Sequence, residues 1–341
     1  MSLPLKSILV TGGAGFIGNN FIRYFLRRHN DIELVNLDKL TYAGNLESLN
    51  DIEGEPHYHF FKGDIADSSC VSRLFHEWQF DAVVNFAAES HVDRSILGPR
   101  IFIETNIKGT LTLLEAAREF GLEKFLQVST DEVYGSLGPT GKFTEKTPIA
   151  TNSPYSASKA SADLLVRAWD KTFKLQTLIT RCSNNYGPFQ FPEKFIPLMI
   201  INALQDKDLP IYGDGKNVRD WIFVEDHCEG IDTVLQTGKP GEIYNIGGGN
   251  EVQNIDMAMM ILDRLGKPHT LLKFVKDRPG HDRRYAMDCA KMESELGWNP
   301  RHSFENGIDE TIKWYVANEK WWGRIISGEY QNYYKLQYEG R

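Results

Sequence analysis

A glycine-rich turn near the start of the chain limits the possible folds more than any other feature. Residues 12–18 read GGAGFIG, between a short apolar run at residues 7–10 and an amphipathic stretch at residues 15–28. In a strand-turn-helix unit, such glycines allow the tight turn, the approach of the backbone to a pyrophosphate and close helix packing. The turn therefore predicts a dinucleotide-binding unit at the start of a parallel sheet, although a glycine run alone also fits a purely structural turn.

Strand-like and helical runs alternate through the first half of the chain. Short apolar runs predict strands, and stretches with apolar residues at every third or fourth position predict helices. The alternation is typical of an α/β fold with a doubly wound parallel Rossmann-type sheet, in which ligands bind at the carboxyl ends of the strands. The expected strands are residues 7–10, 33–37, 57–61, 82–86, 125–129 and 175–181, and the expected helices are residues 15–28, 68–78, 99–120 and 154–173.

The alternation ends after Arg181. Residues 187–210 contain four prolines, and glycine clusters at 213–215 and 247–249 mark two further turns. Residues 242–246 are expected to return to the sheet as a last strand. We therefore predict a dinucleotide-binding Rossmann domain of residues 1–186 with about 222–248, and a smaller, discontinuous α/β substrate lobe of residues 187–221 and 249–341.

Composition argues against several classes of protein. A formal charge of −8 does not suit a nucleic-acid partner. The apolar stretch at residues 195–204 is about half as long as a membrane-spanning helix, and the N-terminal apolar run has no small-residue cleavage site. We therefore expect a cytoplasmic protein with no membrane partner. Four scattered cysteines and the pair His57 and His59, which has no third ligand nearby in sequence, predict reduced thiols and no metal site.

The acid that ends the second predicted strand indicates which dinucleotide binds. Asp38 follows the glycine turn by about twenty residues, where a carboxylate accepts hydrogen bonds from a ribose 2′-hydroxyl and repels a 2′-phosphate. This favours NAD over NADP, although the neighbouring Lys39 softens the repulsion. The residues expected to contact NAD are Gly12, Gly15, Phe16, Ile17, Gly18, Asp38, Lys39, Leu40, Thr41, Asp64, Ile65, Phe86, Ala87, Ala88, Glu89, Ser90, Thr105, Tyr155, Lys159 and Asn185.

Small residues after the fourth predicted strand have two readings. Ala87 and Ala88 are placed to line the inner phosphates of the dinucleotide. They fit equally well as small residues that let a helix pack closely. The sequence leaves both readings open.

A hydroxyl, two acids, a phenol and an amine fall within thirty residues, at Thr130, Asp131, Glu132, Tyr155 and Lys159. The phenol and the amine lie one turn apart on a predicted helix and suit hydride transfer, because a cation favours the phenolate. A dehydrogenase needs one proton acceptor, whereas elimination beside a carbonyl also needs a base for carbon and an acid for the leaving hydroxyl. Acids after a strand often only cap a turn, but together with the phenol and amine they indicate removal of water.

Five segments together resemble one known family. They read DKLTYAGN from Asp38, AAESHVDRS from Ala87, STDEVYG from Ser129, FPEKFIP from Phe191 and DRPGHD from Asp277. Over about residues 6–298, the chain is similar to the dTDP-glucose 4,6-dehydratases, which are extended short-chain dehydrogenases/reductases.

The resemblance implies a lyase reaction in which NAD takes a hydride from C4 of dTDP-glucose and returns it to C6 after loss of water. It implies that Tyr155 is the base at C4, Glu132 the base at C5 and Asp131 the acid at the C6 hydroxyl. It also implies a homodimer formed through residues 99–120 and 154–173. The residues implied to bind the substrate are Ser90, Thr130, Asn184, Lys194, Phe195, Pro210, Ile211, Tyr212, Arg219, Asn254, Asp277, Arg278, Pro279, Gly280 and His281.

Two alternatives remain open. A related enzyme could act on another nucleotide sugar, either as a dehydratase or as an epimerase, but Glu132 speaks against an epimerase, which needs no base at C5. The other alternative is a regulator that binds the dinucleotide without turnover. Release of water without net formation of NADH distinguishes an enzyme from such a regulator.

Overall fold

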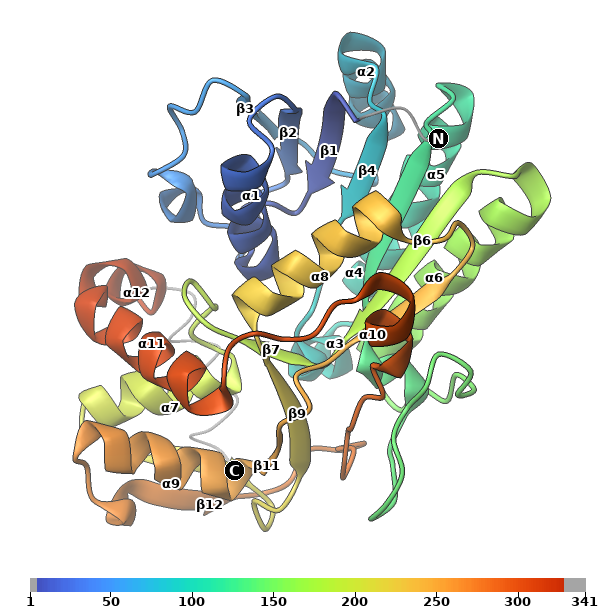
Figure 1. The fold of residues 1–341 in the computed structure, drawn as a ribbon. Helices are drawn as coiled ribbons and strands as arrows, with labels where there is room; N and C mark the ends of the chain where they lie inside the picture. Colours follow the sequence, from blue (N-terminus) through green and yellow to red (C-terminus); the bar gives the residue numbers. More distant parts are fainter. Residues whose placement is uncertain (1–4, 328–341) are drawn as a thin grey trace.

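The computed structural model describes residues 5–327, and a seven-stranded sheet with the order β10-β6-β5-β4-β1-β2-β3 lies at its centre (Figure 1). Every neighbouring pair in this sheet is parallel. The predicted doubly wound Rossmann-type sheet is therefore confirmed, including the return of the late strand. Its strands are β1 (Ser7–Thr11), β2 (Glu33–Asp38), β3 (Tyr58–Lys62), β4 (Ala82–Asn85), β5 (Lys124–Thr130), β6 (Gln176–Cys182) and β10 (Ile243–Ile246).

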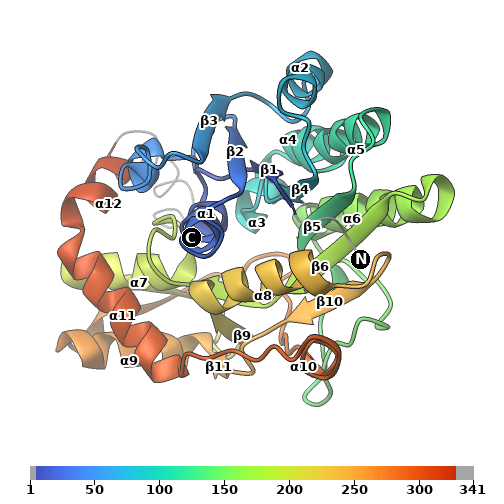
Figure 2. The same ribbon diagram turned by 45° about the horizontal axis from the view of Figure 1, so that its top comes forward.

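Helices cover both faces of the sheet, as Figure 2 shows. One layer contains α1 (Phe16–Arg28) and α8 (Val224–Thr237), and the other contains α2 (Ser68–Trp78), α5 (Thr110–Glu119) and α6 (Pro154–Phe173).

The central strands are apolar on both sides because both faces of the sheet are buried. Ile8 and Val10 of β1 pack in the core with α1 and α8, whereas Leu9, between them, packs in the core with α2, α5 and α6. Successive side chains of a strand point to opposite faces, so each face receives its own apolar set. Burial on both sides explains why the strands read as continuous apolar runs.

The expected helix at residues 99–120 is interrupted by a π-helix. It begins as α4 (Arg100–Phe102), continues through the π-helix η2 (Ile103–Gly109) and ends as α5. Such widened turns are rare and occur mostly near functional sites. Here η2 carries Thr105, one of the residues expected to contact NAD.

The sequence predicted only four helices, and it missed the short helix at residues 92–97 and every helix after residue 173. Helix α7 (Phe195–Leu204) lies within the proline-containing stretch, and α8 follows it along the chain. Pro197 is the third residue of α7, where the backbone amide has no partner within the helix, so proline is tolerated there. The proline count was therefore a wrong indication of irregular structure at this point.

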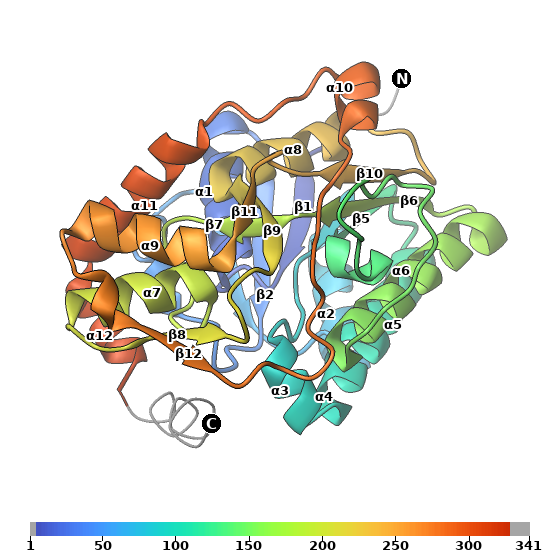
Figure 3. The same ribbon diagram turned by 90° about the horizontal axis from the view of Figure 1, so that it is seen from below.

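A second group of elements lies on the side of the main sheet where its strands end. It is at the bottom of Figure 1 and faces the viewer in Figure 3. It includes a three-stranded sheet with the order β11-β9-β7 and a pair formed by β12 and β8. The segment between β12 and α10 runs alongside β9, since the Val218 amide donates to the Arg283 carbonyl. The bounds are α3 (Val92–Leu97), β7 (Asn184–Tyr186), β8 (Leu209–Tyr212), β9 (Val218–Phe223), β11 (Glu251–Gln253), α9 (Asn254–Leu265), β12 (Leu272–Val275), α10 (Ala290–Leu296), α11 (Phe304–Ala317) and α12 (Glu319–Ile325).

Candidate active site

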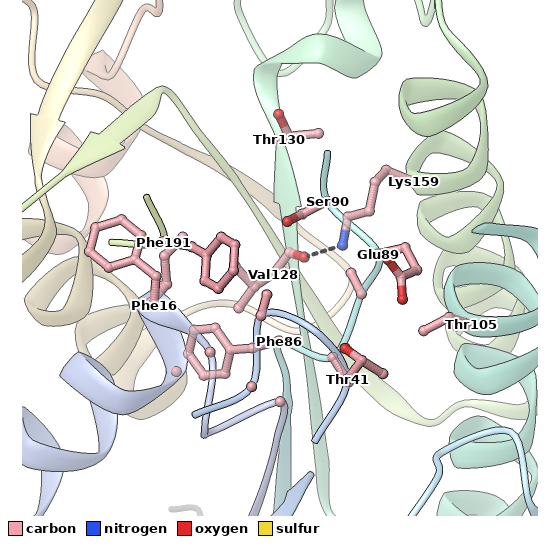
Figure 4. A pocket seen from close by; sticks show the side chains of 18 of the residues that line it. Phe16, Thr41, Phe86, Glu89, Ser90, Thr105, Val128, Thr130, Lys159 and Phe191 are labelled. Atoms are coloured by element: carbon pink, nitrogen blue, oxygen red, sulfur yellow. Dashed lines mark hydrogen bonds between the residues drawn. The ribbon is translucent and has the colours of Figure 1, made fainter. Parts of the chain in front are cut away.

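A cavity of about 290 Å³ lies where the strands of the main sheet end (Figure 4). Every residue expected to contact NAD lines it, with the exception of Leu40. The Leu40 amide donates to Oδ1 of Asp38 at 2.7 Å, so Leu40 helps to orient the Asp38 carboxylate, which lines the cavity. The structure therefore brings together groups that the sequence places up to 173 positions apart, from Gly12 to Asn185.

The glycine turn leaves the N-terminus of α1 open toward this cavity. Helix α1 has Gly15 as its N-cap, without a side-chain cap and without an acid in its first turn. Gly12 has φ +72°, and a Cβ there would lie 2.7 Å from the backbone of Ala87; a Cβ at Gly18 would lie 2.4 Å from the Gly12 carbonyl oxygen. These positions require glycine, and the uncapped amides and the helix dipole suit a pyrophosphate.

Asp38 joins the glycine turn to the loop after β2. Its Oδ2 accepts from the Ala14 amide at 2.9 Å, in addition to the Leu40 contact at Oδ1. Burial raises the pKa of Asp38, and these two amides oppose that effect. Each carboxylate oxygen has a further lone pair for a ribose hydroxyl. Lys39, which was expected to soften the repulsion of a 2′-phosphate, pairs with Asp64 at 2.7 Å.

Thr130 and Asp131, at the end of β5, are buried, and Glu132 beside them is half-buried. The Thr130 hydroxyl accepts from the Glu132 amide at 3.2 Å and so begins the short 3₁₀-helix Asp131–Tyr134. The same hydroxyl lies 3.2 Å from Oδ1 of Asp131. This tight turn places one hydroxyl and both carboxyls at a single strand end.

The phenol and amine come from the start of α6. Ser153 and Ser156 form a capping box, which fixes Tyr155 in the first turn of the helix. Lys159 follows one turn later, and its Nζ donates to the Val128 carbonyl at 2.7 Å (Figure 4). The predicted group of five therefore forms one wall of the cavity.

The two acids experience different electrostatic surroundings. Burial raises the pKa of Asp131 well above its usual range, the Glu132 carboxylate raises it further, and Oδ2 of Asp131 has no hydrogen-bond partner. Burial also raises the pKa of Glu132, but the cations Arg278, Arg219 and Lys194 lower it. Asp131 is thus the better proton donor and Glu132 the better proton acceptor.

The phenol is not activated by the protein alone. Burial raises the pKa of Tyr155 well above its ordinary value, and Glu132 raises it further, while the hydrogen bond with Thr130 lowers it. Burial lowers the pKa of Lys159, which Asp163, one turn further along α6, opposes. Forming the phenolate therefore requires additional positive charge in the cavity, and an oxidised nicotinamide ring carries such a charge.

Several buried polar atoms on the cavity wall have no partner in the protein. They are Oγ of Ser129, Oγ of Ser183, Oδ1 of Asn184, Oδ2 of Asp131, Oε1 of Gln190 and Oε1 of Glu193. An unsatisfied buried polar group costs about 1–3 kcal/mol, so a ligand with matching hydrogen-bonding groups would stabilise the site. Together with the open N-terminus of α1, these atoms fit a bound dinucleotide and a polar substrate.

The expected substrate residues separate into two groups. Ser90, Thr130, Asn184 and Lys194 line the cavity, and the others lie outside it. Those outside are Phe195 at the start of α7, Pro210, Ile211 and Tyr212 in β8, Arg219 in β9, Asn254 at the start of α9, and Asp277, Arg278, Pro279, Gly280 and His281 in the segment after β12.

Two cations of the outer group nevertheless act on the acids. Arg278 and Arg219 are the two strongest charges lowering the pKa of Glu132. Arg219 is held in place because its Nη2 donates to the Asp282 carbonyl at 2.9 Å. His281 Nδ1 lies 2.7 Å from Oδ1 of Asp277, and burial lowers the pKa of His281 to about 4. The cations thus form a positive region next to the cavity.

A buried asparagine that was not anticipated fixes the loop after β4. The Asn106 side chain in η2 donates to the Glu89 carbonyl at 3.0 Å and to the Ser158 hydroxyl at 2.8 Å, and it accepts from the Glu89 amide at 2.8 Å. Other lining residues that were not anticipated are Leu37, Ala43, Gly44, Gly63, Val128, Ser129, Cys182, Ser183, Gln190, Phe191 and Glu193. Phe191 and Glu193 belong to the FPEKFIP segment, which was the only signal for them.

The histidine pair shares one acid. His57 Nδ1 and His59 Nε2 each lie 2.8 Å from the Glu33 carboxylate. Within residues 5–327, no group of three or more His, Cys, Asp or Glu side chains is arranged to hold a metal ion.

Comparison with known proteins gives a consistent result. The family model described as GDP-mannose 4,6 dehydratase matches residues 9–311. A dTDP-glucose 4,6-dehydratase of Xanthomonas campestris pv. campestris (strain B100) is 56% identical over 341 aligned positions, which cover 95% of this chain and 97% of that relative.

Solved structures agree with this similarity. The crystal structure of a dTDP-glucose 4,6-dehydratase from Streptomyces venezuelae with NAD and dTDP bound is 49% identical, with a TM-score of 0.91 and coverage of 94% of this chain and 99% of that one. The enzyme of the same name from Bacillus anthracis str. Ames, in complex with NAD, is 50% identical, with a TM-score of 0.88 and the same coverage of both chains.

Proposed function

The chain belongs to the GDP-mannose 4,6 dehydratase family, and we propose that it is an NAD-dependent hydro-lyase that converts dTDP-glucose to dTDP-4-dehydro-6-deoxyglucose and water. The observation that carries this proposal is the pair of acids Asp131 and Glu132, of which only Glu132 is surrounded by three cations, beside Tyr155 and Lys159. An acid and a base held together beside a hydride-transfer site are what elimination of water next to a carbonyl needs.

Each side chain has one task in this reaction. Tyr155 takes the proton of the C4 hydroxyl, which Thr130 also binds, and Lys159 contributes positive charge near the phenolate. Bound NAD accepts the C4 hydride and later returns it to C6. Glu132 takes the C5 proton once C4 is a carbonyl, and Asp131 donates a proton to the C6 hydroxyl, which leaves as water.

The proton balance closes within these residues. Glu132 returns its proton to C5 when C6 receives the hydride. The proton that Tyr155 took from the C4 hydroxyl replaces the one that Asp131 gave to the leaving water. The cofactor and all the acids and bases therefore end in their starting states.

The positive region next to the cavity is proposed to hold the diphosphate of the substrate. Lys194, Arg219 and Arg278 supply charge there, and arginine binds phosphate oxygens in a bidentate manner. Thymidine is favoured as the nucleoside because the relatives that cover nearly the whole chain act on dTDP-glucose by name.

A homodimer is proposed on the surface of α4, η2 and α6. Ile101, Ile103 and Leu164 on these helices are large apolar residues that are at least two-fifths exposed. Exposed apolar residues gathered on neighbouring helices are typical of a subunit interface. The cytoplasmic location and the division into a Rossmann domain and a substrate lobe stay predictions from the sequence. Within residues 5–327, no helix has the length and apolar character needed to cross a membrane.

The proposal is tested with a panel of nucleotide sugars and mass spectrometry. We expect dTDP-glucose to lose one water while NADH does not accumulate in solution, and UDP-glucose, CDP-glucose and GDP-mannose to react more slowly. A product of unchanged mass but altered stereochemistry would indicate an epimerase. Binding of NAD with no change in any sugar would indicate a regulator, and either result would overturn the proposal.

A further inference from the structure

Three loops that line the cavity are tied together by a cluster at its edge, in which Glu193 also lines the cavity. The loops are residues 41–44 after β2, residues 86–90 after β4, and residues 190–194 before α7. They come from distant parts of the chain, and each contributes lining residues.

Arg94 is the centre of this cluster. It lies in α3, directly after the β4 loop, and its guanidinium carbon is 3.9 Å from the ring centroid of Tyr42. Its Nε and Nη2 lie 3.0 and 2.9 Å from Oε2 of Glu193. The Arg94 side chain thus stacks on the first loop and forms an ion pair with the third, while its own helix follows the second loop directly.

The partners of Arg94 are held firmly. The Glu193 side chain is 1% exposed, and burial raises its pKa, whereas the charges of Lys194 and Arg94 and hydrogen bonds with Arg94 and Tyr42 lower it. The Tyr42 ring meets the Phe191 ring edge-on at 5.6 Å, and Lys194 Nζ donates to the Ser90 carbonyl at 2.8 Å. A buried carboxylate needs its cation, because removing one partner leaves an uncompensated charge.

We propose that Arg94, Tyr42 and Glu193 form a latch that holds these three loops closed over the bound dinucleotide and retains it between turnovers. The residues do not touch the reacting atoms and are positioning residues. The need for retention rests on the proposed function: a hydride taken from C4 must return to C6 of the same sugar, so loss of the reduced cofactor in mid-reaction would leave the enzyme unable to finish.

The test measures exchange of the cofactor rather than activity. Enzyme loaded with NAD is mixed with excess deuterium-labelled NAD, and the protein-bound fraction is followed by mass spectrometry in the absence of sugar. Arg94→Met should exchange NAD about 10- to 100-fold faster than the parent, which is what one charge-assisted hydrogen bond is worth. Arg73→Met, at an exposed position on α2, is the matched control and should exchange at the parent rate.

Two further variants separate the latch from general destabilisation. Tyr42→Leu removes the stacking ring without leaving a buried charge, and Arg94→Met combined with Glu193→Gln removes both charges of the pair. Both should exchange NAD faster than the parent while their thermal midpoints without NAD stay near the parent value. The variant that combines Tyr42→Leu with Arg94→Met should increase the NAD exchange rate by less than the product of the two single increases, because both changes act on the same closed state.

The latch is refuted if folded Arg94→Met and Tyr42→Leu both exchange NAD at the rate of the parent and of Arg73→Met. If Arg94→Met does not fold, Tyr42→Leu and the double variant decide in the same way. Since no sugar is present, this outcome is independent of whether the parent dehydrates dTDP-glucose. Failure of the proposed function and failure of the latch are therefore seen separately.

Discussion

Replacing Glu132 by glutamine should stop the reaction after oxidation. The amide keeps the size of the side chain but cannot accept the C5 proton, so elimination should fall by roughly 10²- to 10⁴-fold, the usual contribution of a positioned general base. After burial, Glu132 is the largest influence that raises the pKa of Tyr155. Its removal makes the phenol easier to ionise, so oxidation at C4 should not be slowed.

The same change should not weaken substrate binding. The cations that lower the pKa of Glu132 are Arg278, Arg219 and Lys194. Removing the Glu132 carboxylate leaves this region more positive, which favours binding of an anionic diphosphate. The variant should therefore show a low kcat with an unchanged or lower KM. Glu77→Gln, at an exposed position on α2, is the control and should behave like the parent.

Stopped-flow absorbance and deuterium exchange measure the two steps separately. On mixing Glu132→Gln with dTDP-glucose, enzyme-bound NADH should appear, while the C5 hydrogen should not exchange with deuterated solvent. Normal exchange at C5 in this variant would show that another residue is the carbon base, and the assignment of the two acids would then be wrong.

Three further results are expected. Tyr155→Phe should suppress the first hydride step by roughly 10²- to 10⁴-fold, so that no NADH signal appears on mixing; a normal signal would contradict its role as base. Asp38→Ala should weaken NAD binding by about 1.5–3 kcal/mol and reduce the preference for NAD over NADP in binding titrations. Unchanged relative affinities would mean that another residue determines this preference. The raised pKa of Asp131 means that the folded state binds a proton more tightly than the unfolded state, so stability declines as pH rises from the unfolded pKa toward the folded one. Asp131→Asn should therefore have a higher thermal midpoint than the parent near neutral pH, with the difference closing toward pH 4; equal midpoints throughout would mean that Asp131 is not held protonated.

The main sheet and most of the cavity could be predicted from the sequence because parallel strands fix where their carboxyl ends meet. Asp38 and Thr130 each end a strand, and Tyr155 follows a recognisable helix start, so their proximity required only the correct strand order. The glycine turn could also be predicted from the sequence. The structure shows the reason for glycine there, because the backbone of Ala87 leaves no room for a side chain at Gly12.

Other features depend on contacts that leave no local pattern. Arg94 and Glu193 lie in two of the quoted segments, AAESHVDRS and FPEKFIP, but they are 99 positions apart and neither segment indicates that they pair. Asn106 lies in an amphipathic stretch, and its role becomes visible only once η2 and the loop after β4 are placed together. The cations that lower the pKa of Glu132 come from three separate segments, so their gathering could not be read from the sequence, and the roles of the two acids stay predictions.

The most direct test of the account follows the hydride itself. The parent enzyme is incubated with dTDP-glucose carrying deuterium at C4, in ordinary water and with unlabelled NAD, and the position of deuterium in the product is read by NMR. The account predicts a 4-keto-6-deoxy product that has lost one water and carries the deuterium at C6. Product without deuterium at C6, with the label found in NADH in solution, would contradict an internal hydride return and with it the proposed reaction.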